Sequence, residues 1–129
     1  MKSYTDIEQS KKLAEILPLE SADMCYILHA SSDNPDWRFD NDIPPMVLGK
    51  ISINELTVKA LPCWSLAALL CILPFPVLYI EMVGGTILWC CECHFIETYE
   101  MVKMEHCNDP VDACVDLIEK LYKLNLFQL

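Results

Sequence analysis

The sequence has little glycine and no recognisable catalytic motif, and these shortages exclude several classes of enzyme. Only 3 of the 129 residues are glycine, so the chain has no glycine-rich loop of the kind that cradles phosphate groups. The metalloprotease pattern H-E-x-x-H and the hydrolase pattern G-x-S-x-G are also absent. The sequence therefore does not predict an enzyme, and we expect no cofactor.

Positive charge is scarce as well. The chain has 9 lysine and arginine residues against 19 aspartate and glutamate residues, which gives a formal net charge of -10. Such a chain repels phosphate backbones, so ordinary nucleic-acid binding is disfavoured, whereas a basic partner is favoured. A protein that mimics nucleic acid would also be acidic. That alternative stays open, although the acidic residues are spread along the chain rather than lined up.

The N-terminal stretch MKSYTDIEQSKKLAEILPLE lacks the apolar run of a signal peptide. We therefore expect a cytoplasmic protein, in which the 8 cysteines are thiols rather than disulfides. Hydrophobic residues make up 53% of the chain, enough for a core without such cross-links. The length predicts a single domain over residues 1–129.

Residues 60–80 contain no charged side chain and are long enough to cross a membrane. Pro74 and Pro76 interrupt this stretch, because proline removes a backbone donor and clashes with the preceding helical turn. We expect a helix over Trp64–Leu73, apolar all round and buried on most sides, followed by a strand. No membrane span is predicted.

The remaining patterns predict an α+β fold with an antiparallel or mixed sheet and about three helices packed mainly on one face. Thr5 and Glu8 form a capping-box pattern at the start of the first helix, and Asn108 or Asp109 before Pro110 starts the last one. Gly84-Gly85 predicts a tight hairpin turn. The expected helices span residues 5–17, 64–73 and 110–122, and the expected strands span residues 24–28, 46–61 (one or two strands), 77–83, 86–95 and 98–104.

Residues 29–45 are rich in turn formers and acids, and we expect a long loop there. Its acidic groups around an aromatic anchor form a candidate contact surface for a basic partner. The spacing of a calcium-binding loop is absent, and the alternative is a solvated loop whose Trp37 and Phe39 fold back onto the core. The candidate binding residues are Asp36, Trp37, Asp40 and Asp42.

The stretch WCCECH, Trp89–His94, raises the question of a metal site. On a strand, side chains alternate between the two faces, so Cys91 and Cys93 share the core face while Cys90 and His94 lie on the other. Cys90 and His94 would then be about 13 Å apart, too far to share one ion. We expect a core strand and no metal. The alternative is a metal- or thiol-dependent protein, with Cys90, Cys93, His94, His106 and Cys107 as its ligands.

Three stretches, LPLESADM, PCWSLAALLCILP and NDPVDACVDLIEKLYKLNL, resemble short uncharacterised bacterial proteins often associated with phage and mobile elements. The resemblance covers about half of the chain, mainly its helices, and brings no activity, cofactor or binding residue with it. It implies an accessory protein in the cytoplasm of a bacterium.

Together these patterns predict a small acidic protein that acts by protein–protein contact. Its first candidate surface is the acidic loop around Trp37. The exposed edge of the sheet is the second, because an edge strand can pair with a strand from a partner.

Overall fold

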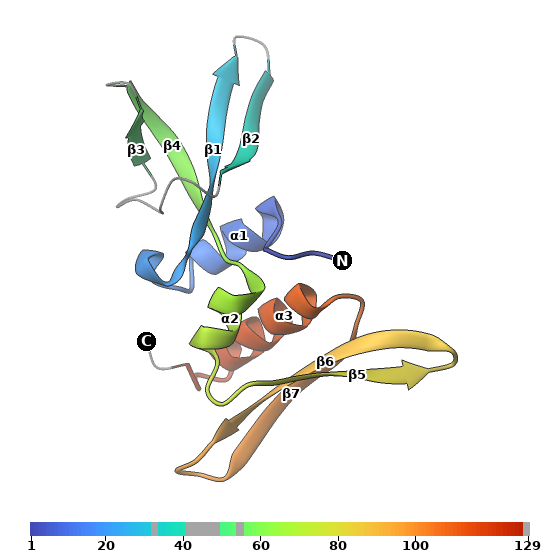
Figure 1. Ribbon diagram of the computed structural model, residues 1–129. Helices are drawn as coiled ribbons and strands as arrows, with labels where there is room; N and C mark the ends of the chain where they lie inside the picture. The colour runs from blue at the N-terminus through green and yellow to red at the C-terminus, as the bar shows by residue number, and fades with distance from the viewer. Residues whose placement is uncertain (32–33, 41–49, 54–55, 128–129) are drawn as a thin grey trace. The chain divides into compact units, whose positions relative to one another are not determined.

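The computed structural model describes residues 1–31, 34–40, 50–53 and 56–127 (Figure 1). Its contacts divide the chain into two compact units, which are described separately below. The N-terminal unit is Thr5–Ser65, and the C-terminal unit is Leu66–Leu129 together with Met1–Tyr4. Both units combine helix with antiparallel sheet, so the predicted α+β class with three helices is confirmed for the described residues.

The N-terminal unit consists of α1, a short 3-10 turn and a sheet with the strand order β2-β1-β4-β3, in which all neighbours are antiparallel. Helix α1 packs on β4. The bounds are α1 Ile7–Ala14, the 3-10 turn Leu19–Ser21, β1 Met24–Ser31, β2 Asn34–Asp40, β3 Lys50–Ile53 and β4 Leu56–Cys63.

Helix α1 begins one residue later than the sequence indicates. Asp6 is the N-cap and accepts a hydrogen bond from the backbone N–H of Gln9, whose side chain accepts one from the backbone of Asp6. Thr5 is fully buried instead, and its hydroxyl accepts a hydrogen bond from the backbone of Trp64. Thr5 therefore joins the start of α1 to the end of β4, and the expectation that it caps the helix is wrong.

The expected loop is wrong for residues 29–31 and 34–40, while residues 32–33 and 41–45 of that stretch lie outside the described residues. Residues up to Ser31 continue β1, and Asn34–Asp40 form β2, in register with β1 so that Leu28 lies opposite Trp37. Pairing with β1 supplies the backbone hydrogen bonds that outweigh the poor strand propensity of the Asn, Pro and Asp residues there. Phe39 packs edge-on against the buried ring of Tyr26, with 5.9 Å between ring centroids.

The C-terminal unit has a three-stranded antiparallel sheet in the order β5-β6-β7. Helix α3 packs on β6 and β7, and α2 packs on α3. The bounds are α2 Leu66–Ile72, β5 Val77–Val83, β6 Thr86–Phe95, β7 Glu100–Cys107 and α3 Pro110–Lys123.

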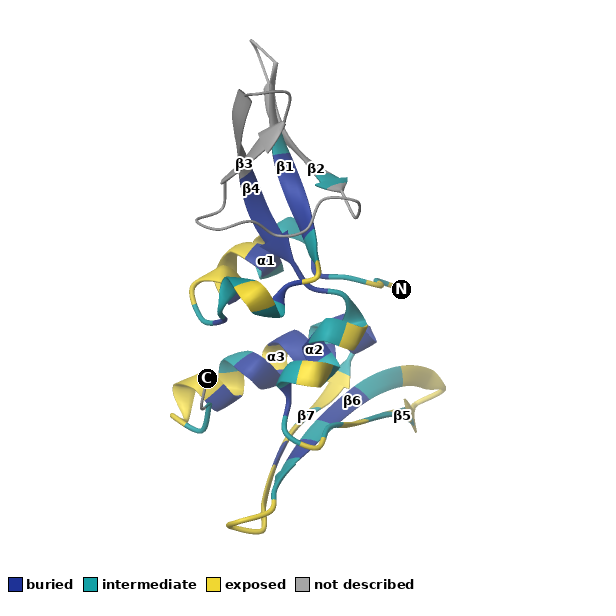
Figure 2. Ribbon diagram, turned by 60° about the vertical axis from the view of Figure 1, so that its left-hand side comes forward, coloured by how far each residue is buried: buried dark blue, intermediate teal, exposed yellow. Residues whose placement is uncertain are grey.

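Helix α3 supplies most of the buried residues of this unit, and it starts after Asp109 as the sequence predicts. The carboxylate of Asp109 caps it and accepts hydrogen bonds from the backbone N–H groups of Val111 and Asp112. Figure 2 shows buried residues along α3 and the middle of β6, while the β5–β6 and β6–β7 turns are exposed. The fully buried side chains of α3 include Val111, Cys114, Leu117, Ile118 and Leu121.

The hairpin predicted at Gly84-Gly85 is confirmed. Val83 pairs with Thr86, and the two glycines have φ angles of 57° and 81°. Positive φ at both central residues is typical of the type I′ turn, whose twist matches that of the strands.

Helix α2 is less buried than the sequence predicts. Leu69 is its buried residue, whereas Ala67 and Cys71 are exposed. The helix packs on α3, and its remaining residues, Leu66, Ala68, Leu70 and Ile72, are half-buried. Within the part of the chain that the structure describes, no helix has both the length and the apolar character needed to cross a membrane.

Candidate functional site

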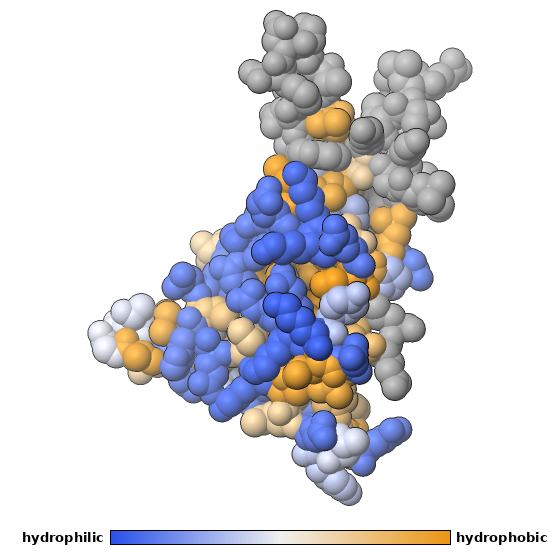
Figure 3. All heavy atoms as spheres, turned by 180° about the vertical axis from the view of Figure 1, so that it is seen from behind, coloured by the Kyte–Doolittle hydropathy of each residue, from blue (hydrophilic) through white to orange (hydrophobic). Residues whose placement is uncertain are grey.

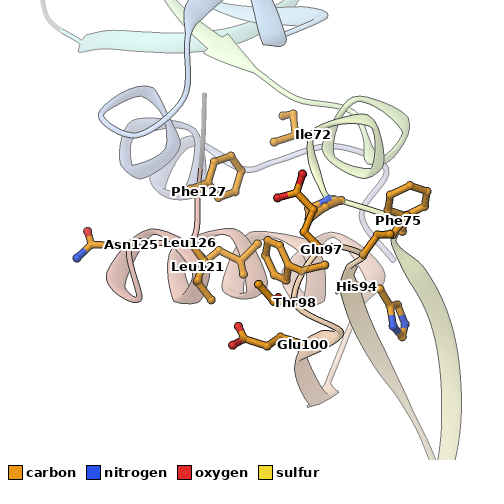
Figure 4. A pocket seen from close by; sticks show the side chains of 13 residues that line it. Ile72, Phe75, His94, Glu97, Thr98, Glu100, Leu121, Asn125, Leu126 and Phe127 are labelled. Atoms are coloured by element: carbon orange, nitrogen blue, oxygen red, sulfur yellow. The ribbon is translucent and has the colours of Figure 1, made fainter.

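A pocket of about 650 Å³ opens in the C-terminal unit where α2, the β6–β7 turn and the end of α3 meet. This volume lies within the range of ~300–1,000 Å³ that is usual for ligand sites. Figure 4 shows its side chains, which come from three separate segments of the chain. The lining residues are Ile72, Pro74, Phe75, His94, Phe95, Ile96, Glu97, Thr98, Glu100, Leu121, Asn125, Leu126 and Phe127.

The end of α3 forms one wall of the pocket. Asn125 has a φ angle of 56°, and the backbone N–H of Leu126 donates to the carbonyl of Leu121 at 3.0 Å. The N–H of Asn125 donates to the carbonyl of Tyr122 at 3.1 Å. These two bonds define a Schellman motif, which reverses the chain after the helix. The motif therefore places Leu126 and Phe127 beside Leu121, where they provide apolar surface.

The opposite wall is formed by the end of β6 and the turn that follows α2. The backbone N–H of His94 donates to the carbonyl of Pro74 at 3.0 Å, which ties these two segments together. Phe75 and Tyr99 have positive φ angles of 44° and 58°, uncommon for residues other than glycine. Such backbone positions are costly, and they are maintained by the surrounding contacts.

The charges at the pocket are negative. Glu97 and Glu100 belong to the lining and are exposed, and no lysine or arginine is among the described lining residues. The carboxylate of Glu97 points toward Ile72 in the view of Figure 4. The Nε2 atom of His94 lies 3.2 Å from Oε1 of Glu92, a further acid two residues earlier on β6. An apolar ligand with a positive charge suits this combination of lining and rim.

The cysteine-rich stretch forms the extended strand that the sequence predicts. Cys91 and Cys93 are fully buried on β6, and the Sγ atom of Cys91 lies 3.9 Å from that of Cys114 on α3. Cys90 lies on the other face, directly opposite Tyr79, yet it is fully buried as well. All three cysteines thus behave as small hydrophobic residues.

The alternative ligand set does not converge. The Nε2 atom of His106 lies 3.2 Å from Glu81, whereas the thiol of Cys107 is 3.9 Å from Asp116. In the described part of the chain, no three His, Cys, Asp or Glu side chains gather in a way that would hold a metal ion. Cys90, Cys93, His94, His106 and Cys107 therefore remain separate groups.

The pKa values of Cys93 and Cys107 are raised, so both thiols keep their protons at neutral pH. Burial raises the pKa of Cys93 to about 11. Burial, together with the carboxylates of Asp116 and Asp112, raises the pKa of Cys107 to about 11. The hydrogen bond that the thiol of Cys114 donates to Cys91, together with burial, raises the pKa of Cys114.

The acidic candidates lie on β2 of the other unit. Asp36 is opposite His29, Trp37 is opposite Leu28 and Asp40 is opposite Cys25. Asp42 lies outside the described residues. Their role in binding stays a prediction, now on a strand rather than on a loop.

Sequence reasoning missed the pocket, because its lining comes from segments that no local pattern connects. One signal was present: the apolar run Leu124–Phe127, interrupted only by Asn125, follows the last helix. Asparagine just after a helix is a common site of the left-handed conformation that reverses the chain.

Comparisons with known proteins find no match: no family model fits the chain, and no curated protein or solved structure is detectably similar to it. The resemblance of its helical segments to short bacterial proteins therefore stays a prediction.

Proposed function

We propose that this protein is a protein-binding module whose pocket accepts an apolar side chain from a basic segment of its partner. One observation carries the proposal: the pocket combines an apolar interior with a rim that contains Glu97 and Glu100 and no lysine or arginine among its described residues. As part of the same proposal, the resemblance of the helical segments supports an accessory role in the cytoplasm of a bacterium that carries a phage or mobile element.

The two properties of the pocket have different roles in this proposal. Burying one large apolar side chain contributes about 1.5–3 kcal/mol, so the half-buried side chains of Leu126 and Phe127 supply affinity. The glutamates favour a lysine or arginine beside that side chain, and they disfavour acidic segments. The net charge of -10 adds a long-range attraction that speeds encounter with a basic partner.

The proposal is tested by selecting short random peptides from a displayed library on the purified full chain. We expect the enriched peptides to carry a large apolar residue next to lysine or arginine. Amide chemical shifts recorded with one such synthetic peptide should change at Ile72, Phe95 and Leu121. Enrichment of peptides without positive charge, or shift changes confined to other regions, would contradict the proposal.

A second test compares charge reversal at the rim of the pocket with charge reversal elsewhere on the surface. Glu97→Lys should weaken binding of the enriched peptide by about tenfold, since attraction is replaced by repulsion at the pocket. Glu20→Lys makes the same change of charge at an exposed position outside the lining, so it should have a much smaller effect. Equal losses in the two variants would show that only the overall charge matters and would remove the pocket from the proposal.

A further inference from the structure

The outer edge of β5 has no strand beside it in the described sheet, whose order is β5-β6-β7. Natural edge strands are protected by lysine, by proline within the strand or by bulges. Strand β5 has Glu81 as its single charged residue and is otherwise apolar or aromatic. Figure 3 shows apolar atoms beside the pale tip of this hairpin. The exposed fractions are 44% for Val77, 51% for Ile80, 65% for Met82 and 44% for Val83.

The hairpin turn determines which backbone groups of β5 are free. In a two-residue hairpin the flanking residues, here Val83 and Thr86, exchange hydrogen bonds. Because hydrogen-bonded and non-bonded positions alternate along an antiparallel pair, Tyr79 and Glu81 also bond to β6. The residues that alternate with these bonded positions have N–H and C=O groups that point away from β6. They are Leu78, Ile80 and Met82.

We propose that β5 pairs antiparallel with β5 of a second copy of this chain, around a two-fold axis at Ile80. In this register Ile80 lies opposite Ile80 of the second copy, and Leu78 lies opposite Met82. Every outward-facing backbone group of Leu78, Ile80 and Met82 then has a partner. The two sheets join into one continuous sheet.

The side chains favour this register over its two neighbours. With the axis at Ile80, Glu81 lies opposite Tyr79 of the second copy, so no like charges meet directly. With the axis at Glu81, the two copies of Glu81 would lie opposite each other, which is destabilising. With the axis at Tyr79, Met82 would face Pro76, which has no N–H to donate. The charge pattern and the proline therefore select one symmetric arrangement.

Within the described C-terminal unit, β5 pairs with β6 on one side, whereas helix α3 packs on β6 and β7. No described strand of this sheet lies beside the outer edge of β5. The Oε2 atom of Glu81 lies 3.2 Å from Nε2 of His106 on β7, so this carboxylate has a partner within its own sheet. The pairing surface is separate from the pocket, so this inference does not depend on the proposed function.

Sedimentation velocity of the full chain from micromolar to millimolar concentration tests for the dimer. Ile80→Lys should weaken dimerisation by at least about tenfold, because each introduced charge meets its own copy at the axis. Ile87→Lys is the control, since Ile87 is 53% exposed on the same hairpin but lies on β6. A monomer at all concentrations, or equal loss in both variants, would overturn the proposal.

Mixing two variants tests the position of the axis. Ile80→Lys and Ile80→Glu should each be monomeric alone, and an equimolar mixture should restore the dimer, because only a residue on the axis meets its own counterpart. Continued monomer in the mixture, with both variants folded by circular dichroism, would place the axis elsewhere and contradict this register.

Hydrogen exchange of the wild-type chain provides a test that needs no variant. Raising the concentration should slow exchange at the amides of Leu78, Ile80 and Met82. The amides of Tyr79 and Glu81 are bonded within the hairpin and should change little. Protection without this alternation would show that the chains associate through another surface and would overturn the inference.

Discussion

The thiol of Cys93 is fully buried on β6, where burial raises its pKa from the ordinary value of 9.0 to about 11. In the unfolded chain the thiol loses its proton near the lower value. Between about pH 9 and 11 the thiol is therefore ionised in the unfolded chain but still protonated in the folded one. Ionisation lowers the free energy of the unfolded state, so the folded state loses stability over this range and not below it.

We accordingly expect the free energy of unfolding to fall between pH 9 and about 11, measured by urea unfolding with a reductant present. Cys93→Ala removes the titrating group, so its decline over this range should be shallower by up to about 3 kcal/mol. Other groups titrate in both proteins and cancel in the comparison. Parallel declines in the two proteins would show that Cys93 does not contribute.

The roles of single residues were harder to predict from the sequence than the positions of helices and strands. Thr5 has the side chain of a helix cap, but its hydroxyl is used by Trp64, which is distant in the sequence. Asp6, one residue on, caps α1 instead. Cys90 is buried although alternation places it away from Cys91 and Cys93. In each case a tertiary contact decides between roles that the residue type leaves open.

At the scale of elements, the cap of α3 supports a specific prediction. The carboxylate of Asp109 accepts hydrogen bonds from Val111, Asp112 and the backbone N–H of Lys2. Asp109→Ala removes the acceptor of these three hydrogen bonds and should lower the free energy of unfolding by about 1–2 kcal/mol, as measured in denaturant. Asp109→Asn keeps an acceptor oxygen and should lose much less. Equal losses would indicate that charge, rather than capping, is responsible.

Elements with strong local signals were predictable. Asp109-Pro110 marks the start of α3, and Gly84-Gly85 marks the hairpin. Strand β2 was not predictable, because Asn34, Pro35 and Asp36 are typical of turns and only pairing with β1 makes them a strand.

Strand β7 extends further than expected, to Cys107. The register between β6 and β7 is irregular between Trp89 and Cys91, opposite a stretch that includes His106 with a φ angle of 62°. One extra residue in a strand bends it locally without ending the pairing. No residue pattern in this stretch signals such a bulge. The pocket could not be predicted from the sequence for a related reason, because its walls come from separate segments that meet only in the folded unit.

At the scale of the whole molecule, the net charge of -10 should affect the two proposed interactions in opposite directions. Salt screens the repulsion between two acidic copies, so the dimer should become tighter as ionic strength rises to roughly 0.5 M. The same screening should weaken binding of a basic peptide. Sedimentation velocity and fluorescence polarisation measure the two responses. A shared direction would mean that at least one interface has been assigned wrongly.

The exposed side of α2 has a practical consequence. Cys71 is exposed there, next to Ile72 of the pocket lining, whereas Cys107 is partly covered and the other cysteines are buried. A maleimide dye should consequently attach to the native chain mainly at this one position. The natural sequence thus provides its own reporter group for pocket occupancy, and no cysteine has to be removed to use it.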